Sequence, residues 1–232
     1  SNLLIVVPVK KLNLVRNKLS DAQIEPLKQS LVSHRDLKIL HMSHNAMSDN
    51  ALGMLAEGLK VNAGIEEIQF THNDLGLPTA SRDQRTPEPT STDEVVPQQL
   101  QSYRAVPVVT QDIVGANEVL TDISLYSNEI DAEGAQLIAQ MLVNKRLLRT
   151  LGLSNNIIGI GGAREIAQVC LSHLVSLTRL ALESNLIGNS GLEAIARALV
   201  ENNTLKEIFL YNNDLDDDTM REFSAMLGNK VN

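Results

Sequence analysis

Apolar and polar residues follow one short pattern that recurs seven times along the chain. In each copy, apolar residues at the first, fourth and sixth positions precede an asparagine, as in LTRLALESNLI at residues 177–187. Side chains two residues apart lie on one face of a β-strand, so each copy predicts a short strand with one buried face. The asparagines are 28, 28, 55, 28, 29 and 28 residues apart, and they are Asn17, Asn45, Asn73, Asn128, Asn156, Asn185 and Asn213.

A helical pattern follows each strand pattern. Apolar residues stand ten and fourteen positions after the asparagines, and residues four apart share one face of a helix. The first set is Leu27, Leu55, Ile138, Ile166, Ile195 and Phe223, and the second is Leu31, Leu59, Leu142, Cys170, Leu199 and Leu227. A strand followed by a helix at a fixed period predicts a solenoid of the α/β class.

These copies resemble leucine-rich repeats of the ribonuclease-inhibitor-like subtype, with units of 28 to 29 residues. The resemblance implies a horseshoe-shaped leucine-rich repeat solenoid with a concave parallel β-sheet and convex α-helices. Residues 1–232 form a single domain of about seven repeats in this interpretation. Each asparagine is expected to satisfy backbone groups of its turn through side-chain hydrogen bonds. Neither end supplies the polar cap that a solenoid needs, so we expect a fragment of a longer array.

The 55-residue interval interrupts the third repeat. No second copy of the strand pattern lies within it, and aligning backwards from Leu120 leaves residues 77–107 as extra. Five of the seven prolines fall in this span, whose polar residues offer little to bury, so the sequence predicts a loop insertion. It is either a tolerated surface insertion or a binding or regulatory loop with Thr86 as a phosphorylation site.

A glycine-rich turn, GIGG at residues 159–162, raises the question of nucleotide binding. Backbone amides at a helix N-terminus bind phosphate in many proteins, and this turn follows a predicted strand. Aligned with the other repeats, however, Gly162 is the counterpart of Gly134 and Gly191, neither of which lies in a glycine-rich loop. The glycines therefore predict a tight corner into a helix that closely approaches the strand layer.

Strand residues that alternate with the buried positions form the concave surface and are the candidate binding residues. One column stands four residues before the asparagines, and another stands two residues before them. From these columns we expect partner contacts by Tyr126, Ser154, Glu183, Phe209, Tyr211, His41 and Gln69. The aromatic members are the strongest candidates, because exposed aromatic side chains often dominate binding energy.

Potential metal and catalytic residues have simpler interpretations. His44 and His72 hold equivalent positions in neighbouring repeats, close enough to share a metal ion, but no cysteine or carboxylate stands in register with them. The acidic run at residues 214–218 departs from a calcium loop and suits the start of a helix. Cys170 takes the place of a leucine and is expected to be buried. His34 and His173, near predicted helix ends, are expected at the surface or as partners of the dipole at a helix C-terminus. We therefore expect no metal, no cofactor and no enzymatic activity.

Net charge and cysteine content limit the classes of binding partner and the cellular compartments that suit this chain. Lys and Arg number 20 against 28 Asp and Glu, and the net charge of −8 argues against nucleic acid or a membrane surface. A protein partner with basic patches is more compatible with that charge. The single cysteine and the absence of a long apolar run favour a reducing, cytoplasmic location.

The family resemblance implies a non-enzymatic protein–protein interaction scaffold that binds a partner through its concave surface. The expected setting is a larger cytoskeletal, ciliary or regulatory complex. Two alternatives stay open. One is a GTPase regulator resembling the Ran GTPase-activating protein, whose functional loop residues find no match here, and the other is the ligand-sensing repeat region of a NOD-like receptor.

Overall fold

Seven short strands form one parallel sheet whose order follows the chain. The computed structural model describes residues 8–45, 47, 49–73, 75, 117–143, 145–172 and 176–228. The strands are β1 (Lys11–Asn13), β2 (Ile39–His41), β3 (Glu67–Gln69), β4 (Asp122–Ser124), β5 (Thr150–Gly152), β6 (Arg179–Ala181) and β7 (Glu207–Phe209). Neighbouring strands pair without a shift, so equivalent residues of successive repeats lie side by side across the sheet.

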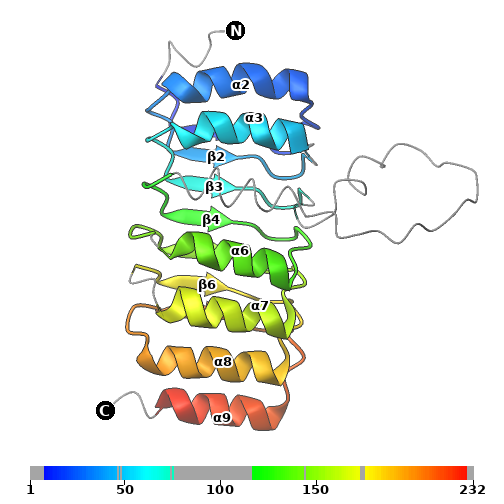
Figure 1. Ribbon diagram of the computed structural model, residues 1–232, viewed down its shortest axis with the longest axis vertical. Helices are drawn as coiled ribbons and strands as arrows, with labels where there is room; N and C mark the ends of the chain where they lie inside the picture. The colour runs from blue at the N-terminus through cyan, green and yellow to red at the C-terminus, as the bar shows by residue number, and fades with distance from the viewer. Residues whose placement is uncertain are drawn as a thin grey trace, which may run out of the picture.

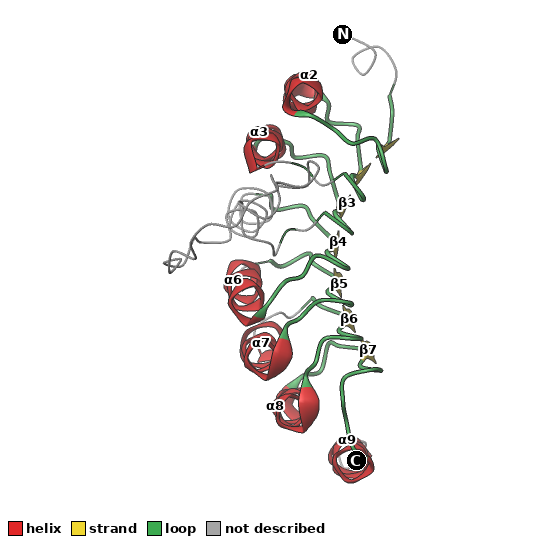
Figure 2. Cartoon of the chain, turned by 90° about the vertical axis from the view of Figure 1, so that its right-hand side faces the viewer, coloured by secondary structure: helices red, strands yellow, loops and turns green. Residues whose placement is uncertain are grey.

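Helices follow the strands and lie on one side of the sheet. They are α2 (Asp21–Ser33), α3 (Asp49–Lys60), α6 (Ala132–Leu142), α7 (Gly159–Ile166), α8 (Gly188–Glu201) and α9 (Asp217–Gly228). Figure 1 shows these helices stacked in chain order along the long axis, and Figure 2 shows the strands on the inner side of the arc that the helices form. The predicted α/β solenoid with a concave sheet and convex helices is confirmed.

Aliphatic side chains fill the layer between sheet and helices. The middle residue of each strand and the residue just after the strand point inward, as do Leu151 and Leu153, which are both fully buried. The two predicted helix positions are buried in the repeats from α2 to α8. In α9 the corresponding Phe223 and Leu227 are half-buried and pack against the same core.

One repeat is longer by a residue, and its helix absorbs the difference. The interval from Asn156 to Asn185 is 29 residues rather than 28. Helix α7 continues into a π-helical turn, η2 (Ala167–Leu171), which takes more residues per turn than an α-helix. Cys170 lies in this turn and is buried as predicted, and burial raises the pKa of its thiol to about 12.

The recurring asparagines form a hydrogen-bonded ladder along the end of the strands, as predicted. In five of the six neighbouring pairs, the later asparagine accepts the backbone N–H of the earlier one through its side-chain oxygen. The distance is 2.9 Å from Asn45 N to Asn73 Oδ1 and 2.9 Å from Asn128 N to Asn156 Oδ1. Side-chain amides donate to carbonyls, such as Asn156 Nδ2 to Leu153 O at 2.7 Å. The ladder thereby satisfies turn groups that are buried away from water.

The ladder is interrupted between Asn156 and Asn185. In the described part of the chain, Asn185 Oδ1 is the one buried side-chain nitrogen or oxygen without a hydrogen-bond partner. The residue after Asn185, Leu186, has a positive φ, whereas Ile157 after Asn156 does not, because β-branched residues strongly disfavour that region. The Ile157 N–H donates to Ile130 O at 2.9 Å. The hydrogen bond that is absent from the ladder therefore coincides with a turn, after Asn156, whose backbone differs from that after Asn185.

A second row of polar side chains bridges the loops that lead into the strands. Asn117 Nδ2 donates to Asn62 O at 3.1 Å, and Lys145 Nζ donates to Asn117 O at 2.8 Å. His34 belongs to this row, since it is only 8% exposed and its Nε2 lies 3.1 Å from Val9 O. Of the two positions predicted for His34, the surface is therefore wrong, because its ring bridges two segments of neighbouring repeats, while its place at the C-terminal end of α2 agrees with the predicted helix end. His173 lies outside the described residues.

Glycines allow neighbouring repeats to pack closely. A Cβ atom at Gly162 would lie 2.8 Å from Ala135 Cβ in α6, and one at Gly191 would lie 3.1 Å from Ala163 Cβ in α7. Still nearer to these positions are the buried Ile158 and Ile187, which lie between strand and helix in the same repeats, so the close approach involves both the glycine's own repeat and the preceding helix. The corner predicted for the glycine-rich turn is observed, with Gly159 at a φ of 64° that glycine adopts readily.

The insertion predicted at residues 77–107, with Thr86, lies outside the described residues. Strands β3 and β4, which precede and follow that interval, pair directly with each other. Within the described ranges, none of the helices combines the length and hydrophobicity that crossing a membrane requires.

Candidate functional site

The concave face of the sheet is the side opposite the described helices (Figure 2). Its outward positions form three columns, of which two are the predicted ones: the third residue of each strand and the residue two places later. The structure adds the first residue of each strand, namely Lys11, Ile39, Glu67, Asp122, Thr150, Arg179 and Glu207. The sequence signal for this column is the same alternation, extended back by one step. The three columns together are called the concave face below.

Tyr126, just after β4, lies across the next strand. A Cβ atom at Gly152 would lie 2.6 Å from Tyr126 Cζ and 2.8 Å from its Oη, so the ring fills the space of the missing side chain. Burial, followed by the nearby Glu183 carboxylate, raises the pKa of the Tyr126 phenol. The phenol therefore stays neutral and keeps its O–H donor.

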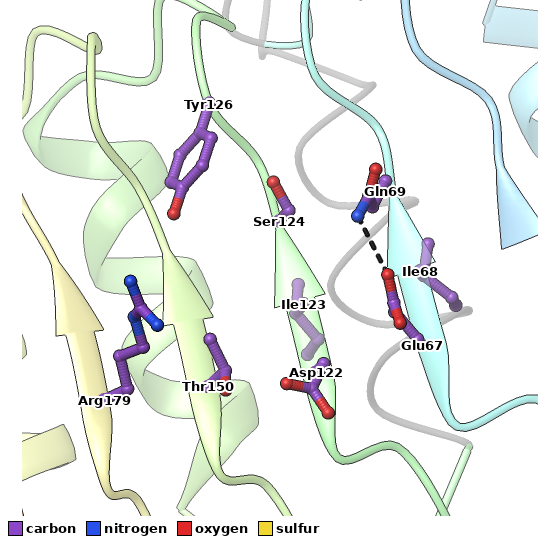
Figure 3. Close-up of a pocket in the computed structure, with 9 residues that line it drawn as sticks. All are labelled: Glu67, Ile68, Gln69, Asp122, Ile123, Ser124, Tyr126, Thr150 and Arg179. Carbon is purple, nitrogen blue, oxygen red and sulfur yellow. Dashed lines mark hydrogen bonds between the residues drawn. The ribbon is translucent and has the colours of Figure 1, made fainter. Parts of the chain in front are cut away.

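Arg179 on β6 is held by two residues of β7. Its guanidinium carbon lies 4.8 Å from the centre of the Phe209 ring, within the range of a cation–π interaction. Its Nε lies 3.5 Å from Glu207 Oε2. Figure 3 shows the Tyr126 hydroxyl turned toward the Arg179 guanidinium. An aromatic and arginine cluster therefore forms on the C-terminal half of the concave face.

A shallow depression of about 250 Å³ lies beside this cluster. Its polar lining residues, drawn in Figure 3, are Glu67, Gln69, Asp122, Ser124, Tyr126, Thr150 and Arg179. The short side chains of Ser124 and Thr150 leave the space open between longer side chains on either side. The depression is consequently acidic toward β3 and β4 and carries a cation at β6.

Two carboxylates stand next to each other in the depression. Glu67 and Asp122 are direct partners in the β3–β4 register, an arrangement in which like charges destabilise a sheet. His41 Nε2 lies 3.1 Å from Glu67 Oε1, and Gln69 Nε2 donates to the same oxygen at 2.8 Å. Asp122 Oδ2 accepts the Thr121 hydroxyl at 2.7 Å. The predicted contact residues His41 and Gln69 therefore hold Glu67 in place.

The remaining predicted contact residues lie on, or just after, the last three strands, β5 to β7. The Ser154 hydroxyl donates to Glu183, and Ser154 is only 7% exposed, so this hydroxyl is engaged within the protein. Tyr211 is 69% exposed, and Phe209 is half-buried. Of the seven predicted contact residues, five lie on the half of the face from β4 to β7 and two lie on β2 and β3. Partner contact by any of them stays a prediction.

The histidines and acidic residues that the sequence raised as metal candidates make contacts within the protein. The His44 and His72 rings stack, with centroids 4.1 Å apart and planes 13° from parallel. Desolvation, followed by His72 and Arg16, lowers the pKa of His44. Asp216 Oδ1 accepts the Thr219 N–H at 2.7 Å, so the acidic run begins a helix as predicted. Nowhere in the described ranges do three or more His, Cys, Asp or Glu residues group in a way that could hold a metal ion.

Strand–helix units stacked around one core, with a sheet face open on the concave side, define a repeat solenoid. A family model described as Leucine Rich repeat matches residues 33–56, 116–139 and 173–196. The chain is a leucine-rich repeat protein, and its 28- and 29-residue units are of the ribonuclease-inhibitor-like subtype.

Similar proteins share the repeats over nearly the whole chain. Ribonuclease inhibitor of Sus scrofa is 24% identical over 222 residues, which are 94% of this chain and 42% of that protein. Protein CARMIL of Dictyostelium discoideum is 24% identical over 218 residues, which are 93% of this chain and 18% of that protein. The crystal structure of human 5T4 (trophoblast glycoprotein) has a TM-score of 0.55 at 21% identity, covering 95% of this chain and 76% of that one, and bears on the fold alone. The chain spans less than half the length of the two curated relatives.

Proposed function

We propose that the chain is a non-enzymatic scaffold whose concave face binds a protein partner. The observation that carries the proposal is the gathering of Tyr126, Arg179, Phe209 and Tyr211 on one half of that face. Tyrosine and arginine are among the residues that most often dominate the energy of protein interfaces. The relative named ribonuclease inhibitor acts, by its name, on a protein, which supports a protein ligand here.

The cluster is partly ordered before any partner arrives. Tyr126 rests over Gly152, and Arg179 is held between Phe209 and Glu207. Binding therefore costs less side-chain entropy than it would for free surface side chains. The exposed Tyr211 adds apolar area, and full burial of a large apolar side chain stabilises a complex by about 1.5 to 3 kcal/mol.

The charge of the concave face supports a partner with basic patches. Its outward columns carry four carboxylates against two cations. The carboxylates are Glu67, Asp122, Glu183 and Glu207, and the cations are Lys11 and Arg179. A lysine or arginine of the partner placed in the depression would relieve the repulsion between the two carboxylates in register there.

The setting of this scaffold stays as the sequence predicts it: a cytoskeletal, ciliary or regulatory complex in the cytoplasm. GTPase regulation and ligand sensing remain the alternatives. A GTP hydrolysis assay separates the first of them from a scaffold. The purified chain would accelerate hydrolysis by a Ran-type GTPase if it were a regulator, and it would leave the rate unchanged if it only binds proteins.

Affinity purification with quantitative mass spectrometry tests the concave face. The baits are the wild-type chain, a Tyr126→Ala/Tyr211→Ala variant, and the control Arg197→Ala. Arg197 lies on α8, on the convex side, with an exposed side chain. We expect proteins enriched by the wild type to fall at least about tenfold with the double variant, as loss of about 1.4 kcal/mol or more requires, and to persist with the control. Full retention by the double variant would refute the proposal.

Gly152→Ala gives a milder perturbation of the same site. The new methyl group would occupy the position of the Tyr126 ring, so the ring must swing away while every other side chain remains. A tyrosine ring at the surface moves easily, and we expect the unfolding temperature to stay close to the wild-type value. Enrichment of the partner should fall nonetheless, because the ordered cluster is lost.

A further inference from the structure

Three large aliphatic side chains are exposed together where strands end and helices begin. Ile157 is 51% exposed, Ile160 is 43% exposed and Leu186 is 57% exposed. Ile157 and Leu186 each follow the asparagine of their repeat by one position, so the stacking of these two repeats places them side by side. Ile160 reaches the next repeat, since a Cβ atom at Gly188 would lie 3.7 Å from Ile160 Cγ1. Ile157, Ile160 and Leu186 are called the edge patch below.

Leu186 is unfavourable in its position for two separate reasons. Its side chain is exposed, and its φ of 57° lies in the left-handed region, which leucine disfavours. Among the described residues at the equivalent position, the others with a positive φ are Lys18, Glu129 and Asp214, which are all hydrophilic. This φ is therefore the regular conformation of the turn, and Leu186 differs in carrying a large exposed apolar side chain there. The exposed leucine therefore points to a ligand that covers it.

Acidic side chains flank the edge patch in both neighbouring repeats. In the preceding repeat, the loop and the first turn of α6 carry Glu129, Asp131 and Glu133. In the following repeat, the loop and the first turn of α9 carry Asp214, Asp216, Asp217 and Asp218. Every charged residue in segments 125–133, 153–163, 182–192 and 210–219 is acidic. An apolar centre is thus bordered by negative charge on both sides.

We propose that the edge patch docks an amphipathic segment of another protein. Its apolar residues cover Ile157, Ile160 and Leu186, and its lysine or arginine residues face the acidic loops on either side. A second copy of this chain does not fit, because two copies would bring acidic loops against each other. The edge patch lies on the loops beyond the strands and on the first turn of α7, outside the concave face, so the inference is independent of the proposed function.

A peptide titration observed by methyl NMR tests this chemistry on the full chain. The probe is a synthetic peptide of leucines and lysines, ordered so that the leucines line one face of a helix. We expect the methyl signals of the edge patch to shift. A peptide of the same composition with scattered leucines keeps its charge but loses its apolar face, so its affinity should be at least about tenfold lower. Equal affinities, or shifts confined to other methyl groups, would overturn the proposal.

Leu186→Asn separates binding from stability. Asparagine tolerates left-handed backbone, so we expect the unfolding temperature to rise by about 2 to 4 °C while the affinity for the ordered peptide falls at least about tenfold. The matched control is Lys18→Asn, which makes the same backbone change in the first repeat. It should raise the unfolding temperature similarly and leave the affinity unchanged.

Two further variants complete the test. Ile157→Thr keeps the branched shape of the side chain and removes apolar surface. It should lower the affinity for the ordered peptide without raising the unfolding temperature. Phe209→Ala alters the concave face and should leave the peptide affinity unchanged. Loss of affinity with Phe209→Ala, or wild-type affinity with both Leu186→Asn and Ile157→Thr, would contradict docking at the edge patch.

Discussion

The gap in the asparagine ladder predicts that two equivalent asparagines contribute unequally to stability. Asn156 and Asn185 are both buried, with exposed fractions of 5% and 0%, and their side-chain amides each donate three hydrogen bonds to backbone carbonyls. They differ at the side-chain oxygen. Asn156 Oδ1 accepts the N–H groups of Asn128 at 2.9 Å and Ile130 at 3.0 Å, whereas Asn185 Oδ1 accepts none.

The difference between the two alanine variants follows from those two bonds. Both variants lose the same number of donated bonds, and these losses largely cancel in the comparison. Asn156→Ala additionally leaves two buried N–H groups without their acceptor, and each such loss costs about 1 kcal/mol or more. We therefore expect Asn156→Ala to lower the free energy of unfolding by about 2 kcal/mol more than Asn185→Ala.

Urea unfolding followed by circular dichroism measures this difference. With a slope of about 2.5 kcal/mol per molar, the midpoint of Asn156→Ala should lie about 0.8 M below that of Asn185→Ala. Gln140→Ala is the control, because Gln140 is exposed within α6 and should shift the midpoint by only about 0.2 M. Coincident midpoints for the two buried variants would refute the hydrogen-bond account of the ladder.

Three further predictions concern packing, protonation and thiol access. Gly162→Val should lower the free energy of unfolding by about 2 kcal/mol, measured by urea titration, because its side chain would collide with Ala135; an unchanged midpoint would contradict this. The lowered pKa of His44, beside His72, means that the unfolded chain takes up the proton more readily, so stability should fall as the pH drops below the ordinary value of 6.5. Thermal unfolding at several pH values should show a weaker fall for His44→Gln, and equal slopes would refute it. The buried thiol of Cys170, with a pKa of about 12, should react with an aromatic disulfide reagent at pH 8 only after urea is added, and prompt labelling of the folded chain would count against its burial.

Periodicity made most of the fold predictable, because every repeat solves the same packing problem with the same residue types. Leu151 and Leu153 are inward because they alternate along a strand, and Ile166 is inward because it keeps a helical spacing. The ladder could also be anticipated, since each turn presents the same backbone groups to the same side chain.

Contacts between repeats are harder to predict from the sequence pattern of a single repeat. The position of Tyr126 depends on the absence of a side chain at Gly152 in the next repeat, and Gly162 serves the helix before it. His34 is buried because it bridges to Val9, a partner that its own helix pattern does not indicate. Such pairings depend on how units stack, which local spacing does not encode.

The surface residues show the same division. The first strand column, with Arg179, follows from alternation and could have been found by extending each strand by one residue. Exposure of Ile157 and Leu186 could also have been inferred, because most other repeats carry a charged residue directly after the asparagine, as at Lys18, Glu129 and Asp214. The left-handed backbone of Leu186 could not, because leucine disfavours that region and Ile157, at the equivalent position, does not adopt it.

Site-specific photo-crosslinking in cells is the most direct test of binding by the concave face. A photoreactive phenylalanine derivative would replace Tyr211 on the concave side in one variant and Arg197 on the convex side in another. Since both side chains are exposed, each probe can reach a bound protein. The account predicts a crosslinked protein partner from position 211 and none from position 197. A partner captured from position 197 and not from position 211 would contradict it.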